Sequence, residues 1–173
     1  MKKLIVFALA LTLGSTAVSC KKGIDKIGSA VEKAGGNDAQ KIIDFNNDFL
    51  DSYKSSSKHI EDVVKYANAA LIKAKGGEVM IMPLVMSSLD HTLNKIKEVP
   101  TGFENEKKNI ETDFSTYKAK KESIEKKYEE LKSYMTSEDY KDDKGAKAET
   151  LKNDIEAEAQ AFFNAGEGVI AKI

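Results

Sequence analysis

Residues 104–135 read ENEKKNIETDFSTYKAKKESIEKKYEELKSYM, and this stretch decides the fold. Its large apolar residues recur at steps of three, four and seven, which places them on one face of an α-helix. They are Ile110, Phe114, Tyr117, Ile124, Tyr128, Leu131 and Met135. The spacing predicts a long amphipathic helix from about Glu104 to Met135. Lys121 is the polar residue on this face, and its long side chain can carry the charge out to solvent.

The same period predicts three further helices. The first runs from Ala39 to Ala74 and ends at Gly76-Gly77, a strong C-terminal signal. Its stripe is Ile42, Phe45, Phe49, Tyr53, Ser56, Ile60, Val63, Ala67, Ala70 and Ala74. The second follows Pro83 to about Glu98, with Val85, Leu89, Leu93 and Ile96 facing inward. The last begins near Gly145 after a polar loop over 136–144, and its stripe is Ala148, Leu151, Ile155, Ala159, Phe162, Val169 and Ile173.

The steps lie close to a seven-residue period, which is typical of helices that pack as in a coiled coil, about 20° from parallel. Only two prolines, Pro83 and Pro100, interrupt the chain, and this favours long helices. We therefore expect an all-α antiparallel bundle of three long helices and one shorter helix over residues 39–173.

The first nineteen residues have the pattern of a secretion signal. Lys2 and Lys3 precede the apolar run Leu4–Leu13, and small residues follow it. The run is shorter than the roughly 20 apolar residues of a spanning helix. The segment ends in Ala17-Val18-Ser19-Cys20, which resembles a lipobox with Ala where Leu is usual. Cys20 is the chain's single cysteine, so no internal disulfide can form, and we expect Cys20 to carry the lipid after cleavage.

Residues 20–38 then form a tether to the folded domain. Ile24, Ile27 and Val31 have helical spacing, so this stretch is either a short membrane-surface helix or a flexible spacer that ends at Gly35-Gly36. Lys21 is not the Asp of inner-membrane retention signals. We expect an outer-membrane protein facing the periplasm, or one on the outer face of the cell membrane in a Gram-positive host.

Composition narrows the class of partner. The chain carries 27 basic and 28 acidic residues, a formal net charge of −1, and the two signs alternate throughout. Without a basic patch, nucleic-acid binding is not expected. The expected partners are the membrane, through the lipid on Cys20, and an envelope protein.

Three groups of residues carry side chains that can bind metal ions. The acids Glu138, Asp139, Asp142 and Asp143 could form a weak Ca²⁺ site, but Asp142 or Asp143 capping the last helix is the favoured interpretation. The thioethers of Met80, Met82 and Met86 could bind Cu(I), although adaptable packing is the favoured role. His59 and His91 lack metal-ligand spacing. We therefore expect no metal and no cofactor.

Catalytic patterns are also lacking. Ser55-Ser56-Ser57 has no nucleophile-elbow context, and Gly76-Gly77 is not followed by the Gly-Lys-Ser of a phosphate loop. We expect a protein that is not an enzyme.

A family resemblance rests on the loop before the last helix. Tyr134, the run Glu138-Asp139-Tyr140-Lys141-Asp142-Asp143-Lys144-Gly145, and the later pair Phe162-Phe163 resemble the YiiG-like bacterial lipoproteins, a domain family of unknown function. Phe45-Asn46 is similar to the family's aromatic-Asn pair, with Phe in place of Tyr. The resemblance covers about Gln40 to Ile173 and implies a helical envelope lipoprotein without an assigned activity.

Two functions remain open for the folded domain. Val79-Met80-Ile81-Met82 leads into Pro83 and Met86, and this apolar run exceeds what one helix face needs. It is either a contact surface for another protein, with Met80, Met82 and Met86 as adaptable anchors, or a cap on the core. The alternative function is a small-ligand or metal carrier with a cavity at the bundle end near these methionines.

Overall fold

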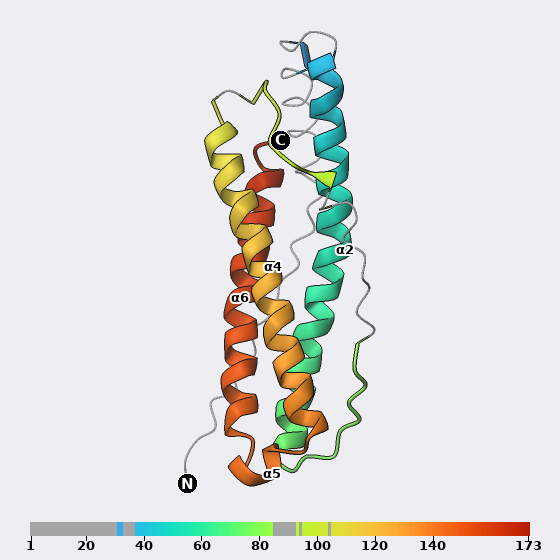
Figure 1. Cartoon of the computed structure of the whole chain (residues 1–173), viewed down its shortest axis with the longest axis vertical. Coiled ribbons are helices and arrows are strands. Elements are labelled where there is room, and N and C mark those ends of the chain that lie inside the picture. The colour runs from blue at the N-terminus through green and yellow to red at the C-terminus, as the bar shows by residue number, and fades with distance from the viewer. Residues whose placement is uncertain (1–30, 33–36, 85–92, 94, 104) are drawn as a thin grey trace.

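The architecture is an all-α bundle. A computed structural model describes residues 31–32, 37–84, 93, 95–103 and 105–173. Within these ranges, α2 (Asn37–Ala74), α4 (Lys107–Thr136) and α6 (Ala146–Ile170) are long and pack side by side, and α5 (Tyr140–Asp143) is a single turn. Figure 1 shows that α2 and α4 run in the same direction while α6 runs opposite to both. The predicted helical bundle is confirmed.

The chain between α2 and α4 returns along the length of the bundle, because both helices start at the same end. Its later part belongs to the core, and the buried residues there are Leu93, Ile96, Val99 and Phe103. Leu93 and Ile96 were expected to face inward. Val85 and Leu89, expected on the same stripe, lie outside the described residues, as does most of the predicted second helix.

The predicted start of that second helix at Pro83 is wrong. Pro83 and Leu84 are not helical, and the chain from Gly77 to Leu84 runs without a turn or bend. Two local effects explain this. Val79 and Ile81 are β-branched, which favours extended backbone. The residue before a proline is also steered away from the α conformation, and here that residue is Met82.

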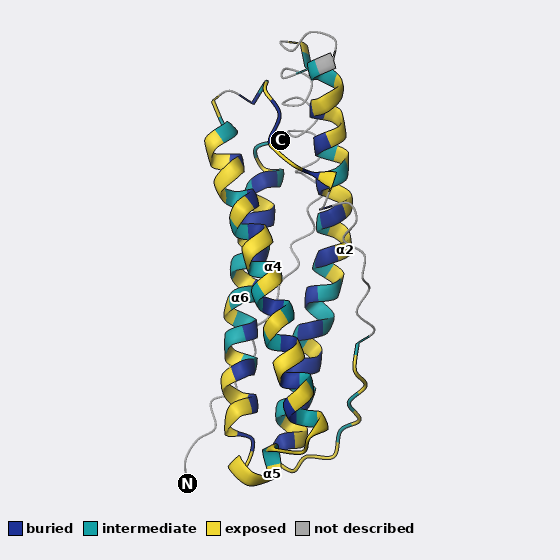
Figure 2. Cartoon of the chain, viewed as in Figure 1, coloured by how far each residue is buried: buried dark blue, intermediate teal, exposed yellow. Residues whose placement is uncertain are grey.

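The core consists of the stripes that the period predicts (Figure 2). On α2 every predicted position is buried except Tyr53, which is half-buried, and Ser52 and Tyr66 join the core as well. Ser56 is only 3% exposed, as expected of a small residue on the stripe. On α4 the last buried residue is Tyr134, whereas the predicted Met135 is half-buried. Fully burying each large apolar side chain stabilises the fold by roughly 1.5–3 kcal/mol.

Aromatic rings connect the three long helices, nearer the end of the bundle where α2 and α4 begin. Tyr117 of α4 stacks on Phe162 of α6 with 4.6 Å between ring centroids, and Phe49 of α2 lies 5.4 Å from Tyr117. Such pairs add about 0.5–1.5 kcal/mol each beyond the burial of their area. Lys121, the polar interruption on α4, forms an ion pair with Glu125 at 2.6 Å and keeps 15% of its side chain exposed. This agrees with the snorkelling that the sequence predicts.

Both predicted helix boundaries near glycines hold, with one addition. α2 ends in a Schellman arrangement, in which Gly77 N–H donates to the Ile72 carbonyl and Gly76 N–H to the Lys73 carbonyl, both at 2.9 Å. Gly76 has a φ of +88°, which suits glycine. The loop predicted over 136–144 is not wholly irregular, because α5 forms a helical turn within it.

Of the predicted tether, residues 20–38, Asn37 and Asp38 belong to α2, which therefore begins two residues before the predicted Ala39. The tether is otherwise described at Val31 and Glu32. Both residues are helical, and Val31 is half-buried against the core. None of the helices described here is both long enough and apolar enough to cross a membrane.

Candidate functional site

The strongest candidate surface is the extended part of the return connection. We call Val79–Leu84 the methionine segment. It leaves the end of α2 near α5 and runs along the outside of the bundle (Figures 1 and 2). Successive residues of an extended chain point to opposite sides. Ile81 accordingly packs partly against the core, whereas Met80 and Met82 point outward and are 83% and 72% exposed.

A turn sets the course of the methionine segment, and contacts of Ile81 and Leu84 hold it on the bundle. At its start, the Schellman arrangement of Gly76 and Gly77 turns the chain away from α2. At its end, the Leu84 N–H donates to the Tyr128 hydroxyl at 2.8 Å. Tyr128 is fully buried on α4 and its ring packs edge-on against Tyr66 of α2, with 5.0 Å between ring centroids. The segment is therefore held on the bundle from Ile81 to Leu84, and its outward side chains remain free of the core.

Met80 and Met82 are the most exposed large apolar side chains among the described residues. Ile72 of α2 is 53% exposed and lies beside Gly77, where the segment begins. Ile72 was not predicted as part of this surface. The available signal was a large apolar residue that lies off the buried stripe of α2 and is therefore expected to be exposed. Met86, the third predicted contact residue, lies outside the described residues.

The acidic loop closes the same end of the bundle by capping a helix. Asp143 accepts hydrogen bonds from the Gly145 N–H at 2.8 Å and the Lys147 N–H at 3.0 Å, both at the start of α6. The Tyr134 hydroxyl also donates to Asp143, and Glu138 pairs with Lys141. These carboxylates are engaged by donors of the protein. The favoured interpretation, in which Asp142 or Asp143 caps the last helix, is confirmed for Asp143.

The hydrogen bonds at Asp143 shift two pKa values. The Tyr134 hydroxyl, with the backbone N–H groups of α6, lowers the pKa of Asp143 from its ordinary value of 3.8. Burial, together with the hydrogen bond to Asp143, raises the pKa of Tyr134 to about 12 from 10.0. Both shifts favour the hydrogen-bonded state, in which a neutral Tyr134 donates to an ionised Asp143. We call this hydrogen bond the latch.

Tyr134→Phe is expected to lower the melting temperature by a few degrees and to flatten its dependence on pH. A lowered acid pKa stabilises the fold above pH 3.8, and this contribution is lost as pH falls through the folded pKa of Asp143. A raised tyrosine pKa stabilises it below pH 10.0, and this contribution is lost as pH rises towards 12. Melting curves of both proteins from pH 2 to 11 check this. Parallel pH profiles would contradict the latch.

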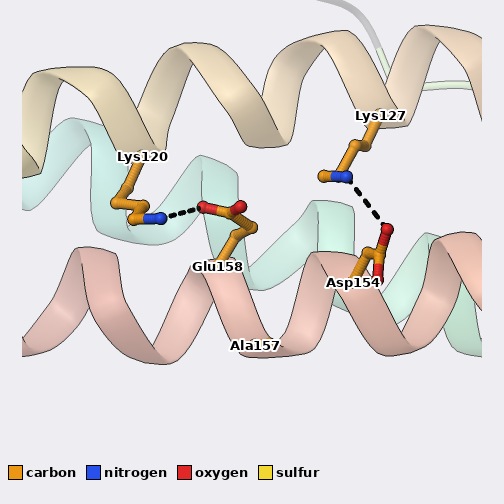
Figure 3. Close-up of a pocket in the computed structure, with 5 residues that line it drawn as sticks. All are labelled: Lys120, Lys127, Asp154, Ala157 and Glu158. Carbon is orange, nitrogen blue, oxygen red and sulfur yellow. Dashed lines mark hydrogen bonds and ion pairs between the residues drawn. The ribbon is translucent and has the colours of Figure 1, made fainter.

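The hollows of the described surface include two that border α4. One lies between α4 and α6, where Lys120 pairs with Glu158 at 2.8 Å and Lys127 pairs with Asp154 at 3.0 Å (Figure 3). The other lies beside α4 under residues 97–99 and includes Phe114 and Glu122. Neither is lined by Met80 or Met82. The first is occupied by side chains that already neutralise one another.

The remaining predicted residues are not brought together by the described structure. Across the described ranges, no three His, Cys, Asp or Glu side chains converge as a metal site would require. His59 is half-buried on α2, while His91 and Cys20 lie outside those ranges.

Comparisons with protein families, with curated proteins and with solved structures find no match to this chain. The fold and the surface described above are therefore the basis for assigning a function.

Proposed function

We propose that this chain is a bacterial envelope lipoprotein, anchored by lipid on Cys20, that acts as a protein-interaction or scaffold module and catalyses no reaction. The observation that carries the interaction role is the exposure of Met80 and Met82, at 83% and 72%, on a segment fixed to the bundle. The lipid anchor rests on the sequence before Cys20. The predicted YiiG-like family membership remains part of this proposal.

The lipid anchor would hold the bundle at a membrane surface. A charged start, a short apolar run and a lone cysteine after small residues are together typical of lipoprotein precursors. Acyl chains contribute about 0.8 kcal/mol per buried CH₂, and two or more chains hold a protein stably on a bilayer. The outer membrane, facing the periplasm, is the proposed location in a Gram-negative host.

Cys20→Ala is expected to abolish incorporation of an alkynyl fatty acid and to prevent stable membrane attachment. The thioether that would carry the lipid cannot form without the cysteine sulfur. Metabolic labelling followed by fractionation of membranes checks this, with Ser19→Ala as the matched control because it keeps a small residue and the sulfur. Membrane attachment of Cys20→Ala equal to that of the wild type would refute the anchor.

The methionine segment suits contact with another protein. Methionine is enriched in the cores of protein interfaces and adapts its flexible thioether to varied partners. Because the backbone of the segment is already ordered on the bundle, binding costs little backbone conformational freedom. Anchoring on one membrane also raises the effective concentration of two proteins, which helps weak contacts.

The carrier alternative has less support. A carrier needs an enclosed cavity with a few converging polar groups. The hollow between α4 and α6 is filled at its rim by two ion pairs, and Met80 and Met82 face solvent. These observations favour the interaction role over the carrier role.

Met80→Glu combined with Met82→Glu is expected to abolish capture of the partner while leaving the melting temperature within about a degree of wild type. Exposed substitutions change stability little, usually within about 0.5 kcal/mol. A charge facing an apolar partner surface is, however, costly to desolvate. Cross-linking in intact membranes, followed by identification of the captured protein, gives the readout.

Ile43→Glu is the matched control, because Ile43 is an exposed apolar residue near the opposite end of α2 from the segment. If the double variant captures the same protein at wild-type yield, the interaction proposal fails. If it melts several degrees lower, Met80 and Met82 serve the core and the proposal fails as well.

A further inference from the structure

The two exposed methionines form a pair with a distinct chemistry. Met80 and Met82 are separated by one residue in an extended chain, so both side chains lie on the same outward face, about 7 Å apart along the backbone. Their exposed fractions, 83% and 72%, leave the thioether sulfurs open to small solutes. Met135, in contrast, is half-buried against the core and is an internal reference on the same molecule.

We propose that Met80 and Met82 are a paired, reversible oxidation site for two-electron oxidants such as hydrogen peroxide. The sulfur lone pair attacks one peroxide oxygen, the O–O bond breaks, and methionine sulfoxide and water form. The sulfur loses two electrons and the peroxide gains them. Reduction by a dithiol-dependent sulfoxide reductase returns the thioether with release of water and a disulfide.

Oxidation would change the surface without changing the fold. A sulfoxide is a polar group with a strong acceptor oxygen, and burying it in an apolar contact without a donor is unfavourable. Neither methionine contributes to the core, so the folded bundle bears none of this cost. The consequence for partner binding rests on the proposed function, whereas the oxidation itself does not.

Oxidation of Met80 and Met82 is expected to leave the contacts of the segment with the bundle in place. Ile81, between the two methionines, keeps its contact with the core, and the Leu84 N–H keeps its hydrogen bond to Tyr128. Methionine oxidation within a core would instead disrupt packing. The site can therefore act as a switch of surface polarity on a constant backbone.

The first test is peptide mapping by mass spectrometry after graded exposure of the folded protein to hydrogen peroxide. Met80 and Met82 are expected to gain one oxygen each several-fold faster than Met135, because susceptibility follows exposure. The melting temperature should stay unchanged until Met135 reacts. Equal rates at all three residues, or early melting, would overturn the proposal. Reductases of both sulfoxide stereospecificities, with dithiothreitol, should restore the original mass.

The second test separates the oxidation from the proposed function. Retention on a phenyl column is expected to fall after peroxide treatment of the wild type and to recover after reduction. The variant Met80→Leu with Met82→Leu keeps an apolar surface without sulfur, so its retention and its cross-linking to a partner should not respond to peroxide. A response equal to wild type would overturn the site. Loss of capture in the glutamate variant tests the interaction alone.

Discussion

Leu131→Asp is expected to unfold the bundle at room temperature. Leu131 is fully buried on α4, at a position that the helical period assigns to the core. The substitution removes a large apolar side chain, which costs about 2–5 kcal/mol, and adds an unpaired buried carboxylate, which costs several kcal/mol more. The sum is comparable to the whole stability of a typical domain, about 5–15 kcal/mol.

Circular dichroism and denaturant titration measure this effect. Ser133→Asp is the matched control, since Ser133 is exposed on the same helix two residues away. It should shift the free energy of unfolding by no more than about 0.5 kcal/mol. A cooperative melting transition of Leu131→Asp at the wild-type temperature would show that the stripe on α4 does not form the core.

Gly145→Ala is expected to destabilise the protein by about 3 kcal/mol, the second-largest effect. Gly145 has a φ of +76°, where a side chain costs about 1–2 kcal/mol. A Cβ at this position would also lie 2.9 Å from the Cβ of Ala74 and 3.1 Å from its backbone oxygen. The helix backbone of α2 cannot move aside as a flexible side chain can, so overpacking adds about 1–3 kcal/mol.

Gly76→Ala separates these two contributions. Gly76 also has a positive φ, +88°, but a Cβ there would meet nothing within 4 Å. It should therefore lose only the conformational cost, about 1–2 kcal/mol. The difference between the two variants in urea unfolding measures the close approach of the α5–α6 turn to α2. Equal losses would mean that the turn can move away from Ala74.

The long helices were predictable because their information is local. Apolar residues with helical spacing share one face of a helix, and this face is the one that packs inward. The buried residues of α2, α4 and α6 therefore follow from the spacing. Local signals also located the glycines at the end of α2 and the capping role of the acidic loop. The helical turn α5 inside that loop was not visible, since four residues, Tyr140 and three charged ones, are too few to show a period.

The candidate surface was only half predictable. The excess of apolar residues at Val79–Met82 marked it, but the sequence left open whether these residues serve a partner or the core. The helical start at Pro83 was wrong. Proline is favoured in the first turn of a helix, but the β-branched residues and the residue before Pro83 favour extended backbone. Ile72 was overlooked because it lies off the helical stripe.

The sequence by itself determined the helix class and most of the residues that α2, α4 and α6 bury, because both depend on residues near one another in the chain. Only the tertiary structure decided which side of the methionine segment faces solvent. That choice depends on distant contacts, chiefly the buried hydroxyl of Tyr128 receiving the Leu84 N–H, and on the parallel course of α2 and α4, which makes the connection return along the bundle. Contacts between residues 44 positions apart leave no periodic trace in the sequence.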